Sequence, residues 1–442
     1  MRLEDDGQHI IVEQYRNASS PSIQRLTYEN NELVRPSYKE IQVKLFNILF
    51  IAVLAFGGCI TDSGLDRGHF ISDNAQPVEV SFEIVSDLII VSAEINGVAG
   101  KFLFDNGFTM SAVNEGFGRR ANIDFRGGTN IQDANNKRSS VPEATVDSVV
   151  ISGQTFVKTG FYQIETDNFF PCDTIDGVIG ASIINKANWK IDFDSMTMQI
   201  SSLPFQGEGS TMDISFSRNN SSFVKITVQG VSVKCKIDLG SSSEIKVDWK
   251  NAKDAFIGIP AEKRIGIMSL SAHGLGNVDT TYLTSERQDV RYSGASLPRG
   301  GRVLLKRDLK YQGYVGVNYF KDYGLIINSL ERQYILTPTN KPLTFEMDSS
   351  YGLVIYHLEE EWRIIQLNPN DPLLSDIALM DKVTMIDSLP MSKFESICDF
   401  KDYMKDKRES KEAIVATLED RKGSVVLPYR RRQAQGIPAY RK

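Results

Sequence analysis

Two stretches of the chain align with each other without a gap, and this internal repeat constrains the fold more than any other feature. VSAEINGVAGKFLFDNG at residues 91–107 lies over VKITVQGVSVKCKIDLG at residues 224–240, with six identities in 17 positions. Ordinary residue usage gives about one identity by chance. Each copy alternates apolar and polar residues around a Gly-containing turn, which predicts a β-hairpin. Each hairpin leads into a loop that begins with an aspartate, Asp105 or Asp238.

A second correspondence lies downstream of each hairpin. DGVIGASIINKANWKIDFDSMTMQI at residues 176–200 matches QGYVGVNYFKDYGLIINSLERQYIL at residues 312–336 in pattern. Both contain Gly, two apolar residues and Gly, then an apolar helical stretch and two strands joined by a polar turn. We therefore expect a duplicated β-rich unit between residues 77 and 342, with lobes at 77–205 and 206–342.

The order of these parts resembles that of the retropepsin-like aspartic peptidases. The resemblance rests on FLFDNGFT with VIGASIIN in the first lobe, and on CKIDLGSS with YVGVNYFK in the second. It implies a mainly β fold of two acid-protease lobes, with the apolar-apolar-Gly strand behind each aspartate loop. It also implies that each lobe contributes one catalytic aspartate, Asp105 and Asp238, and that no cofactor or metal is needed.

Paired carboxylates would explain why two copies are present. Two carboxylates about 3 Å apart repel each other by roughly 5 kcal/mol at an effective dielectric constant of 20. One of them therefore keeps its proton at mildly acidic pH. The ionised group would accept a proton from the attacking water while the protonated group donates to the scissile carbonyl. Because the pair titrates together, the two roles cannot be divided between Asp105 and Asp238.

A single Asp-x-Gly is most often only a turn, and the repeat is what favours a facing pair of carboxylates. The family usually has Thr or Ser between Asp and Gly, where the hydroxyl bridges the two loops. Here Asn106 and Leu239 take that place; the Asn106 amide can donate and the Leu239 side chain cannot. A missing buried hydrogen bond costs on the order of 1 to 3 kcal/mol. At the next position Ser241 can hydrogen-bond its carboxylate, whereas Phe108 cannot.

Two segments occupy the place of the family's flap hairpins. They run over residues 131–153 and 269–285, between the aspartate loop and the apolar-apolar-Gly strand of each lobe. Plain surface hairpins would give the same pattern, so both interpretations stay open and no substrate contact is assigned.

The pattern changes after residue 346, and residues 346–431 resemble a small α+β PDZ-like domain. The resemblance rests on residues that fall at the family's Pro, Asp, Ile/Val, Asn/Asp and final Pro positions: Pro372, Asp381, Val383, Ile386, Asp387 and Pro390. Two expected glycines are replaced, near Ile377 and at Met380. Such domains capture extended peptides by strand addition, but a packing domain that binds nothing is an equal alternative. Residues 432–442 form a basic tail.

The apolar run VKLFNILFIAVLAFGGC at residues 43–59 is shorter than a membrane span and is typical of a signal peptide. Its FGGC ending resembles the lipobox of bacterial lipoproteins, with Phe56 in place of the usual Leu. That resemblance implies a lipid on Cys59 and a lipid-anchored protein in the cell envelope, facing the periplasm or the exterior. Residues 1–42 are unusual before a signal peptide, so we expect a non-native or disordered extension and a true start at Val43 or Leu45. Residues 60–76 read as a linker.

The charge, the histidines and the cysteines of the chain argue against several classes of function. A net charge of −6 and a pI near 5.5 argue against nucleic acid as a partner. The four histidines have no metal-ligand spacing. After Cys59 the chain has Cys172, Cys235 and Cys398, in no zinc or redox pattern. We expect buried thiols, with a disulfide between Cys172 and Cys235 as the alternative.

The sequence thus predicts an aspartic endopeptidase that acts on a peptide or protein substrate and is held at a membrane by a lipid anchor. Two alternatives remain. One is a catalytically inactive descendant that binds peptides or a partner in the cell envelope. The other is an envelope β protein in which the Asp-x-Gly loops are only structural.

Overall fold

The computed structural model divides the chain into two compact units, Met1–Ser63 and Gly64–Lys442. The described residues are 68–72, 76–132, 138–166, 170–217, 219–267, 277–339, 351–419 and 423–429, with the backbone of 2–5, 10–13, 28–29, 32–33, 270–271, 274–275 and 435–436. The first unit contains two antiparallel hairpins, β1 (Arg2–Asp5) with β2 (Ile10–Glu13) and β3 (Tyr28–Glu29) with β4 (Glu32–Leu33). The predicted signal peptide and Cys59 lie outside the described residues. Among the residues described, no helix combines the length and the apolar character needed to cross a membrane.

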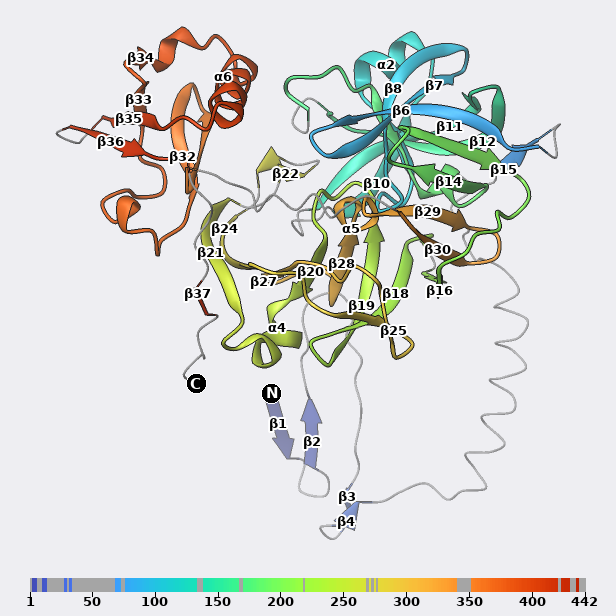
Figure 1. Cartoon of the computed structure of the whole chain (residues 1–442). Helices are drawn as coiled ribbons and strands as arrows, with labels where there is room; N and C mark the ends of the chain where they lie inside the picture. The colour runs from blue at the N-terminus through green and yellow to red at the C-terminus, as the bar shows by residue number, and fades with distance from the viewer. Residues whose placement is uncertain are drawn as a thin grey trace. The chain divides into compact units, whose positions relative to one another are not determined.

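In the second unit, the first copy of the repeat forms the predicted hairpin from β7 (Leu88–Ile95) and β8 (Val98–Phe104). Its turn residues Asn96 and Gly97 have φ of +50° and +79°, the left-handed backbone that a two-residue hairpin turn requires. The other elements of this lobe are β5 (His69–Ile71), β6 (Val78–Val85), β9 (Ser111–Val113), α2 (Glu115–Arg120), β10 (Arg126–Gln132), β11 (Arg138–Ile151), β12 (Gln154–Gln163), β13 (Gly177–Ile179) and α3 (Ala181–Ile184) (Figure 1).

The second copy forms an equivalent hairpin from β18 (Ser222–Val228) and β19 (Val231–Asp238). Its turn residues Gln229 and Gly230 have φ of +50° and +76°, so both copies make the same turn. The lobe continues with β17 (Ser215–Phe216), β20 (Ile245–Asp248), α4 (Trp249–Ala252), η1 (Lys253–Phe256), β21 (Pro260–Ile267), β22 (Leu270–Ser271), β23 (Gly274–Leu275), β24 (Val278–Thr284), β25 (Val290–Tyr292), β26 (Ala295–Ser296), β27 (Val303–Lys306), β28 (Gly313–Gly316) and α5 (Val317–Phe320).

The last strands of the two copies join into one sheet. β14 (Asn188–Asp192) pairs with β15 (Thr197–Ser201) of its own lobe and with β29 (Tyr323–Asn328) of the other, antiparallel in both cases. β30 (Gln333–Pro338) and β16 (Ser210–Asp213) continue the sheet beyond β29. The strands predicted from the second correspondence are thus present in both lobes and hold the lobes together.

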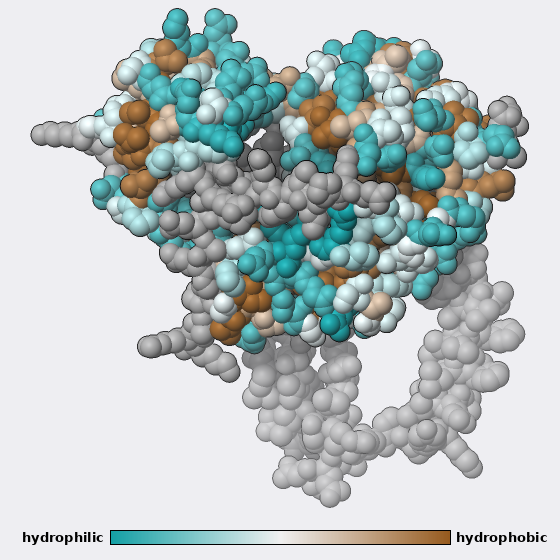
Figure 2. Space-filling model, in the orientation of Figure 1, coloured by the Kyte–Doolittle hydropathy of each residue, from teal (hydrophilic) through white to brown (hydrophobic). Residues whose placement is uncertain are grey.

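A single hydrophobic core runs through both lobes. It includes Phe104, Trp189, Ile237 and Leu239, all fully buried, and the rings of Phe104 and Trp189 meet edge to face with centroids 4.9 Å apart. On the face shown in Figure 2, hydrophobic residues occur in small groups between hydrophilic ones. The fold is mainly β, as predicted, and its core lies directly behind the two aspartate loops.

The C-terminal part has its own hydrophobic core, which includes Trp362, Phe400 and Ile414. Its elements are β31 (Leu353–Leu358), β32 (Glu361–Leu367), η2 (Pro372–Leu374), β33 (Val383–Ile386), β34 (Leu389–Pro390), η3 (Met391–Lys393), α6 (Ile397–Glu409), β35 (Ile414–Leu418), β36 (Ser424–Leu427) and, beyond them, β37 (Gln435–Gly436). The Ser396 hydroxyl and the Asp399 carboxylate form a capping box at the start of α6. β32 also pairs with β21 of the second lobe.

The cysteine pairing differs from the sequence-based expectation. Cys172 forms a disulfide with Cys398, 226 residues away, and Cys235 is a free thiol buried in the core. The alternative of a Cys172–Cys235 disulfide is therefore wrong, because Cys235 lies on β19 and faces the interior. The expectation of a buried thiol is correct for Cys235 alone.

Candidate active site

The first aspartate follows directly after β8. The Asp105 N–H donates to the carbonyl of Ile179, the last residue of β13, at 3.0 Å, and β13 runs parallel to β8. Behind the loop, the Ala181 N–H donates to the Phe108 carbonyl at 2.8 Å. The apolar-apolar-Gly strand and its short helix therefore support the aspartate loop from behind, as the family resemblance implies.

The second aspartate is held by the same contacts. Asp238 ends β19 and lies next to Gly316 of β28 in parallel register. The Val317 N–H donates to the Ser241 carbonyl at 2.9 Å, which repeats the contact between Ala181 and Phe108. The two loops thus have equivalent supports in the two lobes.

The two loops meet at their glycines. A Cβ on Gly107 would lie 2.3 Å from Asp238 Oδ1 and 2.8 Å from Asp105 Oδ1, so oxygens of both carboxylates flank one point. A Cβ on Gly240 would lie 2.3 Å from Asp105 Cγ, which excludes any side chain there. Asp105 Oδ1 accepts hydrogen bonds from the Gly107 N–H at 2.7 Å and from the Gly240 N–H at 2.9 Å. The structure therefore brings the two sequence-predicted carboxylates together.

Asn106 connects the loops in place of the missing hydroxyls. Its Oδ1 accepts a hydrogen bond from the backbone N–H of Leu239 at 3.0 Å, and its Nδ2 donates to the Tyr334 hydroxyl at 2.8 Å. Both Asn106 and Leu239 are fully buried. The Leu239 side chain, which cannot donate, packs in the hydrophobic core instead. The Asn106 side chain is therefore linked to the other lobe through the backbone N–H of Leu239, which the sequence pattern does not reveal.

The environment of the site shifts the ionisation of Asp105. Burial and, second, the negative charge of Asp238 raise the pKa of Asp105 from 3.8 to about 7. The ammonium of Lys236 and the N–H groups of Gly107 and Gly240 act in the opposite direction. A carboxyl with this pKa keeps a proton at mildly acidic pH, which is the state that general acid catalysis requires.

Two lysines lie beside the pair, and the sequence-based reasoning missed both. Lys236 Nζ donates to the Gly107 carbonyl, and Lys246 Nζ donates to the Ser241 hydroxyl at 2.8 Å. Burial lowers the pKa of the Lys246 ammonium, and the charge of Asp238 opposes this effect. The sequence contains one sign of Lys236: in the gapless alignment of the repeat, this charged residue stands where the first copy has apolar Leu103.

Ser241 has different partners from the one expected. Its hydroxyl lies 2.9 Å from that of Ser243 and accepts from Lys246, and the structure gives it no hydrogen bond to Asp238 within the described residues. The Ser241 hydroxyl is therefore hydrogen-bonded by Lys246, whereas the sequence predicted a hydrogen bond to the Asp238 carboxylate.

The expected flap segments fall on hairpins of the two lobes. Residues 131–153 cover the end of β10 and the whole of β11, which pair antiparallel. Residues 269–285 include β24, which pairs with β21. Residues 133–137, 268–269, 272–273 and 276 lie outside the described part of the chain. No substrate contact is assigned to either hairpin.

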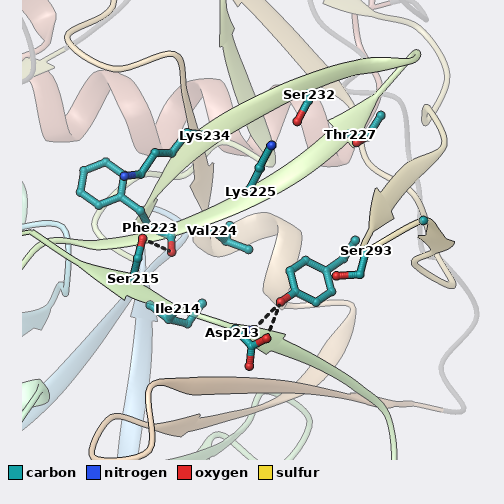
Figure 3. Close-up of a pocket in the computed structure, with 12 residues that line it drawn as sticks. Asp213, Ile214, Ser215, Phe223, Val224, Lys225, Thr227, Ser232, Lys234 and Ser293 are labelled. Carbon is teal, nitrogen blue, oxygen red and sulfur yellow. Dashed lines mark hydrogen bonds between the residues drawn. The ribbon is translucent and has the colours of Figure 1, made fainter.

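A separate hollow of about 640 Å³ lies on the second lobe. Figure 3 shows its lining, with Lys225 and Lys234 on the β18–β19 hairpin and Asp213 on the opposite side. The Tyr292 hydroxyl accepts from the Asp213 N–H at 2.7 Å and donates to its carboxylate at 3.2 Å. Neither aspartate of the facing pair lines this hollow.

Comparison with known proteins finds a similarity within the first lobe. A family model described as aspartyl protease matches residues 91–183, which include Asp105 and the apolar-apolar-Gly strand. Residues 91–183 are therefore similar to the aspartyl proteases, while the second aspartate loop lies outside the match. No curated protein matches the chain. Within the described residues, no group of three or more His, Cys, Asp or Glu side chains could hold a metal ion.

Proposed function

We propose that the chain is an aspartic endopeptidase in which Asp105 and Asp238 activate a water between them. The observation that carries this proposal is the mutual approach of the two loops, in which each glycine lies against the carboxylate of the opposite lobe. The similarity of residues 91–183 to the aspartyl proteases supports the same assignment.

In the proposed reaction, the carboxylate pair holds one proton. The ionised carboxylate takes a proton from the water as its oxygen attacks the scissile carbonyl carbon, and the protonated carboxyl donates to the carbonyl oxygen. The tetrahedral intermediate then collapses: the C–N bond breaks, the leaving nitrogen takes the proton from the protonated carboxyl, and a hydroxyl of the intermediate returns a proton to the other carboxylate, which restores the pair. The two roles are assigned to the pair as a whole, because two interacting carboxylates share their protons.

Peptide cleavage by the chain starting after Cys59 tests this proposal. A mixed peptide library at pH 4 to 7 should be cleaved by the wild type and not by Asp105→Asn or Asp238→Asn. Asp124→Asn is the matched control, because Asp124 is exposed and forms a surface ion pair with Arg126. Equal cleavage by all four proteins, or cleavage by none, would contradict the proposal.

The second candidate function is peptide binding without hydrolysis. Two observations favour it: the buried Leu239 has no hydroxyl, and the Lys236 ammonium donates to the loop of the opposite lobe. Selective binding of library peptides, with no cleavage product by mass spectrometry, would establish this function in place of the peptidase.

We also propose that the protein is a lipid-anchored component of the cell envelope. The Cys172–Cys398 disulfide supports this location, because disulfides persist in oxidising compartments. A shift from the membrane fraction to the soluble fraction on Cys59→Ser would support the anchor. A peptide from residues 1–40 in the mature protein would contradict the proposed start and the removal of the leader.

The C-terminal part is proposed to act as a PDZ-like peptide-capture domain. Met380, at a position where the PDZ pattern has glycine, adopts φ +71°, a conformation that glycine adopts readily. A pull-down of extended peptides that is lost when residues 346–431 are removed would support this role. Unchanged capture without these residues would favour a packing domain.

A further inference from the structure

The strand register places a row of three side chains beside Asp105. Val178 of β13 pairs with Leu103 of β8 on one side and with Ala112 of β9 on the other. Residues paired in register lie on the same face of a sheet, and Leu103 shares that face with Asp105, two residues later. This first-lobe row (Leu103, Val178, Ala112) is buried in an apolar cluster that also contains Met110.

The same register in the second lobe gives a row of different chemistry. Tyr314 of β28 pairs with Lys236 of β19 and with Lys246 of β20. Lys236 shares a face with Asp238, two residues later. The second-lobe row (Lys236, Tyr314, Lys246) therefore occupies the positions that are wholly apolar in the first lobe, so the two sides of the candidate active site differ in charge.

The two ammonium groups are held by hydrogen bonds to neutral oxygens. Lys236 Nζ donates to the Gly107 carbonyl and lies 5.6 Å from the centre of the Tyr311 ring, and Lys246 Nζ donates to the Ser241 hydroxyl. In the part of the chain that the structure describes, neither ammonium forms an ion pair with a carboxylate, although Lys236 acts electrostatically on Asp105 and Asp238 acts on Lys246.

The charges near the pair therefore do not cancel. When Asp105 and Asp238 share one proton, they carry a single negative charge against the two positive charges of Lys236 and Lys246. A positive charge removed from water is unfavourable unless an anion compensates it, and a carboxylate on a bound ligand would do so.

We propose that the second-lobe row selects substrates that carry a carboxylate close to the scissile bond. This inference rests on the proposed peptidase function and names its substrate class: peptides with an acidic group on the side of the second lobe. The carboxylate can belong to an Asp or Glu side chain or to the C-terminus of a short peptide, and the two sources are distinguished by the test.

The test compares paired peptides that differ in one carboxylate. One arm replaces Glu by Gln at each position around the scissile bond, and the other compares a free C-terminus with an amidated one. For the full chain, kcat/KM should be about 10- to 100-fold higher for the acidic member of at least one pair, the range expected for a hydrogen bond to a charged group. A ratio near one in every pair would overturn the proposal.

One variant and one matched control test whether the second-lobe row causes the selectivity. Lys246→Met keeps a long side chain but removes one of the two charges of the row, so it should lower the acid-to-neutral ratio. Lys225→Met is the matched control, because Lys225 is exposed on β18 and lines the separate hollow. It should leave the ratio unchanged. An unchanged ratio in Lys246→Met would overturn the assignment.

A binding measurement distinguishes failure of this inference from failure of the proposed peptidase function. Fluorescence anisotropy of the same labelled peptides with the Asp105→Asn/Asp238→Asn double variant, with and without Lys246→Met, needs no catalysis. Tighter binding of the acidic peptide that is weakened by Lys246→Met supports the inference even if the wild type cleaves nothing. Cleavage without any preference for the acidic peptide leaves the peptidase function standing and overturns the inference.

Discussion

Asn106 Oδ1 accepts a hydrogen bond from the backbone N–H of Leu239, 3.0 Å away across the two lobes. The side chain of one loop thus bonds the main chain of the other, so the residue facing Asn106 needs no polar side chain. This relationship explains how the loops stay together although neither carries the hydroxyl that the family uses at this position.

Asn106→Ala should lower the free energy of unfolding by about 1 to 3 kcal/mol, because it leaves the buried Leu239 N–H without an acceptor. Chemical denaturation followed by tryptophan fluorescence measures this loss. Tyr334→Phe removes only the hydroxyl that accepts from Asn106 and should cost less. A loss in Asn106→Ala no greater than that in Tyr334→Phe would contradict the importance of the Leu239 contact.

Gly240→Ala should reduce peptide cleavage by about 100-fold or more, because the new Cβ must displace the Asp105 carboxylate, and small displacements of catalytic groups have effects of this size. Steady-state kinetics on a cleaved library peptide gives the measurement. Gly116→Ala is the control, since a Cβ there meets only an ordinary contact at 3.6 Å in α2. Its activity should equal that of the wild type.

The raised pKa of Asp105 should make the protein less stable as the pH rises. Between pH 4 and 7 the folded protein keeps a proton on Asp105 that the unfolded chain, with a pKa of 3.8, releases. Stability from this group is therefore complete below pH 4 and is lost as the pH rises through about 7. The loss should amount to a few kcal/mol, measured by urea denaturation across this range.

Asp105→Asn should remove this pH-dependent component, because the amide does not titrate. Asp124→Asn, at the exposed surface, should retain it. If the wild type and Asp105→Asn lost stability in parallel between pH 4 and 7, the raised pKa would not be the cause of the loss.

Reduction of the Cys172–Cys398 disulfide should lower the free energy of unfolding by about 2 to 5 kcal/mol, because the cross-link closes a long loop. Thermal unfolding with and without dithiothreitol measures the effect. Cys398→Ser should no longer respond to dithiothreitol, whereas Cys235→Ala should respond like the wild type because Cys235 is unpaired. Equal transitions of the wild type with and without reductant would contradict this prediction.

The repeat predicted the parts of the fold that follow from local pattern. Both hairpins, the apolar-apolar-Gly strands and the short helices α3 and α5 were predicted from the residue pattern, whereas the position of these strands behind the aspartate loops was implied by the family resemblance. These elements depend on residues close together in the chain, so one sequence is enough to reveal them.

Contacts between distant residues could not be predicted in this way. The acceptor role of Asn106 depends on a backbone N–H, which every residue except proline has. Lys246 escaped notice because one extra residue separates it from Asp238, compared with Ala112 from Asp105, so a gapless alignment does not pair the two. The partner of Cys172 lies 226 residues away, and the spacing of the thiols carries no information about it.

The same cross-link turns the segment from Cys172 to Cys398 into a covalent ring that contains the entire second lobe. A single cut by a protease anywhere in that ring opens it without separating the two ends. A chain nicked once in the second lobe would therefore migrate as one band on a gel without reductant and as two bands with it. The disulfide therefore keeps Asp238 attached to the rest of the protein after a single cut in this segment.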